Sequence, residues 1–259
     1  MKAFQPTGDL EADFLTECHE LLDYIEADLS ALDQDGAETK EDVVNRIFRA
    51  AHSIKSGAGF FDLAVLRDLA QKIESAIDLI RSRQMPPSHE VVDLLSHGFD
   101  QAGDLIEQYR KGEPADVSQL VAVLDELIVD HLPFEEKFLF DARVEVALPQ
   151  AGGIVEASVL DLMQARRRGK SIYLIRYDLM RDIQRQGKTP WEVFKSLIES
   201  GTILETVLDL HSAGTLNDPP SNQLPLVVLY ATPLELERVA ALAHIPAERI
   251  QLVETNRAS

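Results

Sequence analysis

One stretch of the chain combines a histidine, a lysine and several residues with almost no side chain. The stretch RAAHSIKSGAGFFDL contains His52, Lys55 and Ser56, followed by Gly57 and Gly59. Residues three and four apart on a helix share a face, so Lys55 and Ser56 would lie beside His52. Because glycine costs up to about 1 kcal/mol in a helix relative to alanine, Gly57 and Gly59 indicate that another surface approaches this face closely.

A histidine in this setting has the chemistry of a phosphoryl acceptor. An ordinary imidazole has a pKa of about 6.5, so near pH 7 much of it is neutral and one ring nitrogen holds a free lone pair that can attack phosphorus. A carboxylate bonded to the other ring nitrogen fixes the tautomer and increases basicity, and Glu74, on the next predicted helix, is placed to supply it. Lys55 would offset the phosphoryl charge, about −1.5 to −2 units in phosphoesters near pH 7.

The elements that must position these residues are helices. Apolar residues recur at spacings of three and four from residue 10 to about 131. The pattern predicts five helices, at about residues 10–35, 40–58, 66–80, 88–110 and 116–130. Short turns between long amphipathic helices are typical of an antiparallel bundle.

The second half of the chain has a different pattern. We interpret residues 132–155 as a linker that could hold one short strand, and residues 156–168 as a helix. Apolar segments after residue 168 then follow the order β-α-β-β-α-β, with Thr189 as the N-cap of the first of these helices. This order is that of a ferredoxin-like α/β domain. The sequence therefore predicts an α+β protein with a bundle at residues 1–131, a linker at 132–155 and a ferredoxin-like domain at 156–259.

Composition and charge exclude several classes of function. The net charge of the 259 residues is −19, and residues 1–138 carry −17 of it. Nucleic-acid binding depends on basic patches, so a protein partner is expected instead. No apolar stretch approaches the roughly 20 residues of a membrane-spanning helix, and we find no secretory signal. A single cysteine, Cys18, cannot form an internal disulfide. We therefore expect a soluble, cytoplasmic protein without membrane insertion.

The segment FRAAHSIKSGAGFFDL resembles the phosphoacceptor motif of histidine phosphotransfer (HPt) domains. More specifically, residues 8–131 resemble the N-terminal domain of CheA-type chemotaxis kinases. The resemblance implies that His52 is the phosphorylated histidine, that Lys55 is the motif lysine, and that Glu74 orients the imidazole.

Two residues depart from that family's pattern. Ser56 stands where the family usually has glycine, and Gln71 stands where CheA-type domains often have a second histidine. Serine is small enough to keep the surface open, and glutamine can donate a hydrogen bond but cannot titrate. We assign Ser56, Gly57, Gly59 and Gln71 to a partner-binding surface.

The resemblance also implies two partners. A histidine kinase catalytic domain would donate the phosphoryl group, and the aspartate of a response regulator receiver domain would accept it. Residues 156–255 resemble, more weakly, the small α/β segment between the phosphotransfer domain and the kinase core in some CheA-type proteins. Such segments can dock response regulators.

The chain itself has no glycine-rich ATP-lid sequence. We therefore expect a phosphocarrier and not a self-sufficient kinase, with no cofactor and no metal, since the other histidines lack paired ligand spacing. Both a complete relay protein and the N-terminal region of a longer CheA-like kinase fit this interpretation.

Two other functions remain open on the sequence alone. The bundle could be an interaction scaffold that no longer carries phosphate, with Ser56 and Gln71 as signs of that loss. An enzyme built on the α/β domain ranks last, because that domain shows no convincing cluster of acid, base and nucleophile. For His52 considered by itself, an ordinary solvated histidine is the simpler interpretation; Lys55 and Glu74 together favour the phosphoacceptor.

Overall fold

The chain divides into two compact units, residues 1–137 and 138–259, which are described separately. The structure is a computed structural model. It describes residues 6–35, 41–114, 116–148, 153–183, 189–208 and 224–253.

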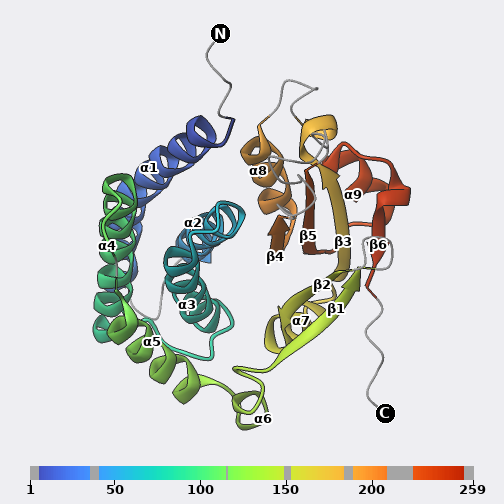
Figure 1. Ribbon diagram of the computed structural model, residues 1–259. Coiled ribbons are helices and arrows are strands. Elements are labelled where there is room, and N and C mark those ends of the chain that lie inside the picture. The colour runs from blue at the N-terminus through green and yellow to red at the C-terminus, as the bar shows by residue number, and fades with distance from the viewer. Residues whose placement is uncertain are drawn as a thin grey trace. The chain divides into compact units, whose positions relative to one another are not determined.

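The first unit is helical. Its helices are α1 (Pro6–Asp35), α2 (Glu41–Phe60), α3 (Ala64–Arg81), α4 (His89–Lys111), α5 (Ser118–His131) and the short α6 (Phe134–Lys137). Helices α1 to α4 form a closed ring of neighbours: α1 packs against α2 and α4, and α3 packs against α2 and α4. Helix α5 packs on α3 (Figure 1). The predicted bundle is therefore a four-helix core with α5 added to one side.

A tight turn joins α2 to α3 and makes the two helices neighbours. Helix α2 ends at Phe60, and the amide of Leu63 donates to the carbonyl of Ala58 at 2.8 Å. Asp62 adopts a left-handed conformation with φ of 57°, which a short polar side chain tolerates better than most. The chain then reverses into α3, so the two helices lie side by side.

The second unit contains a sheet and a separate hairpin. Its elements are β1 (Arg143–Leu148), β2 (Gly153–Ser158), α7 (Val159–Arg167), β3 (Ser171–Asp178), the π-helix η2 (Leu179–Ile183), α8 (Pro190–Ser200), β4 (Thr202–Leu208), β5 (Pro225–Thr232), α9 (Leu236–Ala243), the 3₁₀ turn η5 (Ala247–Arg249) and β6 (Ile250–Leu252). Strands β3 to β6 form one sheet in the order β4-β5-β3-β6, and every neighbouring pair is antiparallel.

Both faces of this sheet are covered. Ile172, Leu174 and Leu229 belong to a cluster shared with the β1–β2 hairpin and α7. Because side chains alternate along a strand, Tyr230 points to the opposite face, where its hydroxyl donates to the carbonyl of Leu197 on α8 at 2.9 Å. Strand β5 has seven of its eight residues buried, as expected for a central strand.

Two features of the second unit bear directly on the sequence predictions. Thr189 is the N-cap of α8, as expected, and it forms a reciprocal capping box with Glu192. The segment interpreted as a linker instead belongs largely to the second unit: β1 and β2 pair from Arg143↔Ser158 to Leu148↔Gly153. The single short strand expected there is one arm of a hairpin.

Among the described residues, no helix is both long enough and apolar enough to span a membrane.

Candidate functional site

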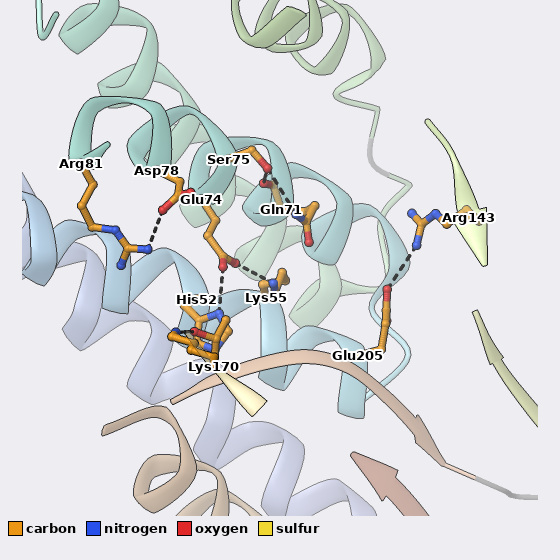
Figure 2. A network of polar contacts seen from close by, with 11 residues as sticks. His52, Lys55, Gln71, Glu74, Ser75, Asp78, Arg81, Arg143, Lys170 and Glu205 are labelled. Atoms are coloured by element: carbon orange, nitrogen blue, oxygen red, sulfur yellow. Dashed lines mark hydrogen bonds and ion pairs between the residues drawn. The ribbon is translucent and has the colours of Figure 1, made fainter. Parts of the chain in front are cut away.

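His52 and Glu74 meet at the contact between α2 and α3. The Nδ1 atom of His52 lies 3.0 Å from Oε1 of Glu74. Glu74 reaches from the middle of α3 across to α2 (Figure 2). The predicted contact between the imidazole of His52 and the carboxylate of Glu74 is confirmed.

Lys55 binds the second oxygen of the same carboxylate. Its Nζ lies 2.7 Å from Oε2 of Glu74, so the carboxylate bridges the imidazole and the ammonium (Figure 2). Burial by itself would raise the pKa of Glu74, but the charges of Lys55 and His52 and their hydrogen bonds lower it to about 2. Glu74 is therefore ionised at neutral pH.

The ionised carboxylate determines which ring nitrogen carries the proton. A carboxylate only accepts hydrogen bonds, so Nδ1 of His52 must be the donor to Oε1 of Glu74. In the neutral ring the lone pair then lies on Nε2. This is the tautomer that a nucleophile at Nε2 requires.

Two neighbours within the helical unit surround the imidazole of His52. Phe48, one turn before His52, stacks on one face of the ring, and Glu74 occupies the Nδ1 edge. Helical spacing therefore placed His52 on the face of α2 that meets α3.

The four residues assigned to a partner-binding surface lie in different settings. Ser56 is 3% exposed, and its hydroxyl has no hydrogen-bond partner in the described part of the chain. Gly57 lies against α1, where an added Cβ would be 2.1 Å from the ring of Phe14. Gly59 is half-buried near the end of α2. Gln71 donates to Ser75 on its own helix at 3.3 Å.

Gly57 therefore serves the close packing of α1 on α2. A glycine permits close approach on whichever side it faces, and the position of Phe14 identifies that side. This location gives no support to a partner-binding role for Gly57.

Sequence reasoning did not single out three further residues beside the site. The rings of Phe48 and His52 are nearly parallel, with centroids 5.9 Å apart and 5° between their planes. The guanidinium of Arg81 lies 3.8 Å from the centroid of Phe48 and donates to Asp78 at 2.6 Å. The available signal was spacing: Phe48 precedes His52 by four residues, and Asp78 follows Glu74 by four.

The helical part of the chain is similar to known proteins. Residues 9–130 match the family model described as "Hpt domain". The chemotaxis protein CheA of Rhizobium meliloti is 35% identical over 129 residues, covering 49% of this chain and 17% of that protein. CheA of Cereibacter sphaeroides is 29% identical over 154 residues, 56% of this chain and 22% of that protein. CheA of Treponema pallidum is 35% identical over 118 residues, 45% of this chain and 14% of that protein.

The helical part of the chain is therefore a histidine phosphotransfer domain of the type found in CheA. The match spans less than a quarter of the length of each of these three relatives.

Proposed function

We propose that His52 accepts a phosphoryl group from ATP held by a histidine kinase catalytic domain and passes it to an aspartate of a response regulator receiver domain. The observation that carries this proposal is the buried bridge in which Glu74 binds both Nδ1 of His52 and Nζ of Lys55. It lies within the residues that match the Hpt family model.

Acceptance of the group would form one bond and break one. The lone pair on Nε2 of His52 attacks the γ-phosphorus, the bond from phosphorus to the bridging oxygen of ADP breaks, and ADP leaves with that electron pair. The ring, which keeps its Nδ1 proton, then carries positive charge. Glu74, 3.0 Å from Nδ1, stabilises that charge.

Donation of the group would reverse these changes. A carboxylate oxygen of the receiver aspartate attacks phosphorus, the N–P bond breaks, and its electron pair returns to Nε2 of His52. Glu74 holds the Nδ1 proton in place throughout, so the ring returns to its starting tautomer.

Both steps need a partner to reach Nε2. Because Glu74 occupies the Nδ1 edge of the ring, the phosphoryl group has to approach His52 from the Nε2 edge. Lys55, held by Glu74 at 2.7 Å, keeps a cation next to the position where phosphate charge would arrive.

Phosphate incorporation tests the proposal directly. The full chain is incubated with ATP and a CheA-type kinase catalytic fragment, and wild type is compared with His52→Gln. The matched control is His19→Gln, since His19 also contacts a carboxylate, Glu107, at 2.9 Å but on the bundle surface. A receiver domain is added afterwards.

We expect label on the wild type and on His19→Gln, and none on His52→Gln. The label should be acid-labile, alkali-stable and lost to the receiver domain. If a kinase fragment that labels its own phosphotransfer domain leaves this wild type unlabelled, the proposal is refuted and the scaffold function becomes the better account.

For the second unit we propose a ferredoxin-like topology. Its support is the strand order β4-β5-β3-β6 with antiparallel neighbours, in which the first and third strands of a β-α-β-β-α-β sequence lie adjacent at the centre. Docking of a response regulator by this unit stays a prediction, as does the cytoplasmic location of the protein.

A further inference from the structure

A stack of three flat groups leads from α3 to the imidazole on α2. Asp78 accepts a hydrogen bond from Nη2 of Arg81 at 2.6 Å, and Figure 2 shows Arg81 turned toward Asp78 on the same helix. The guanidinium of Arg81 lies over Phe48, 3.8 Å from the ring centroid. Phe48 in turn lies parallel to His52, with 5° between the two ring planes.

The hydrogen bond to Glu74 does not by itself fix the imidazole. The ring is attached to α2 through Cβ, so its plane changes by rotation about the Cα–Cβ and Cβ–Cγ bonds. The 3.0 Å bond from Nδ1 to Oε1 restricts these rotations, but a hydrogen bond tolerates a misalignment of about 30°. A rotation within that range moves Nε2 and its lone pair, and a contact on the face of the ring would narrow the range.

Phe48 supplies a constraint of this kind. Parallel, offset rings with centroids about 4.5 to 7 Å apart attract each other, and the 5.9 Å separation from His52 falls in that range. A phenyl ring can itself tilt unless something holds its other contacts. Arg81 holds Phe48 through its flat guanidinium, and Asp78 holds Arg81.

We infer that Phe48 and Arg81 are positioning residues, which set the plane of the His52 imidazole while Glu74 sets its tautomer. This inference rests on the proposed function, because the plane matters only if Nε2 has to meet phosphorus in line. Misplacement of a reacting atom by about 1 Å can cost on the order of a hundredfold in rate, so even a partial loss of the stack should be measurable.

The test uses a substitution that keeps the charge. Arg81→Lys retains a cation for Asp78 but removes the planar face that stacks on Phe48. The matched control is Arg46→Lys, because Arg46 is also paired with a carboxylate on this bundle, Asp28, at 2.6 Å. Phe48→Leu is the second variant, since it removes the ring directly and depends on a different side chain.

Two measurements are made on the full chain. The first is the rate of phosphorylation by a CheA-type kinase catalytic fragment, separated into kcat and KM. The second is the ¹⁵N spectrum of the histidine rings without phosphorylation, with His52 assigned by comparison with His52→Gln. The second measurement does not depend on any phosphoryl transfer.

For Arg81→Lys and Phe48→Leu we expect kcat to fall by about three- to tenfold, the size typical of losing one such contact, with KM unchanged. The Nδ1 and Nε2 shifts of His52 should move and their signals broaden, because a ring whose plane is less restricted changes its angle to Glu74 and to its neighbours while it keeps the same tautomer. Arg46→Lys should change neither measurement.

The inference is overturned if Arg81→Lys behaves as Arg46→Lys does in both measurements, or if it changes KM alone, which would make Arg81 a partner contact. If the wild type accepts no phosphate but the His52 shifts respond to Arg81→Lys, the proposed function is refuted and the positioning role is supported. The phosphorylation rate and the ¹⁵N shifts of His52 therefore distinguish failure of the proposed function from failure of the positioning role.

Discussion

Removal of the Glu74 charge should change both the stability of the bundle and the chemistry of His52. The pKa of Glu74 falls from 4.5 to about 2 in the folded chain. At about 1.4 kcal/mol per pKa unit, this corresponds to about 3 kcal/mol of stabilisation at neutral pH. Glu74→Gln keeps the size and the hydrogen-bonding oxygen but loses this charge, and it leaves Lys55 buried beside a neutral group.

The direction of the pKa shift of Glu74 determines how the effect of Glu74→Gln on stability changes with pH. Because the folded pKa of Glu74 lies below the unfolded value, its contribution is complete above about pH 4.5 and is lost as the pH falls toward 2. We therefore expect Glu74→Gln to lower the free energy of unfolding by about 3 kcal/mol at pH 7. The difference from wild type should shrink below pH 4.5.

Denaturant unfolding at pH 7, 5, 4 and 3 measures this difference. Glu107→Gln is the matched control, since Glu107 also contacts a histidine, His19, at 2.9 Å, but its side chain is 45% exposed. Its loss should be much smaller, because exposed pairs contribute little. A Glu74→Gln difference that is independent of pH, or no larger than that of Glu107→Gln, would refute the assignment of Glu74 as a buried, ionised bridge.

Two further substitutions test how the site and the second unit are built. Gly57→Ala should lower the free energy of unfolding of the bundle by about 1 to 3 kcal/mol, because the new Cβ would be 2.1 Å from the ring of Phe14. Denaturant unfolding measures this loss, and Gly103→Ala should cost less, since its Cβ would be an ordinary 3.5 Å from its nearest neighbour. Equal losses in the two variants would contradict the packing role of Gly57. Thr189→Ala removes the side-chain acceptor for the amide of Glu192 and should lower the free energy of unfolding by about 1 kcal/mol. Thr189→Ser keeps a hydroxyl and should retain most of that stability. A similar loss in both variants would argue against the capping box.

Much of the bundle and of its site could be predicted from local patterns. The 3.6-residue periodicity identified α2 and α3, and the family resemblance paired His52 with Glu74 across 22 residues of sequence. Thr189 followed by proline identified the start of α8 for the same local reason. These features depend on neighbours along one helix or on a motif.

The parts that could not be predicted depend on tertiary packing. Periodicity shows which face of α2 carries His52 but not which side chains lie against the ring, so the stacking of Phe48 on His52 was missed. A glycine permits close approach from either side, so the sequence could not show that Gly57 faces Phe14. The sequence did not predict the β1–β2 hairpin, because a strand of six residues such as β1 is identified mainly by its pairing with a partner strand.

The turn between α2 and α3 has a consequence for how the site forms during folding. Phe48, His52, Glu74 and Arg81 all come from one pair of consecutive helices. Contacts between elements close in sequence form quickly, because only a short loop has to close. The site can therefore assemble as soon as this helical hairpin docks on its neighbours, while the antiparallel sheet of the second unit, which pairs β3 with β5 across more than 45 residues, needs a slower search.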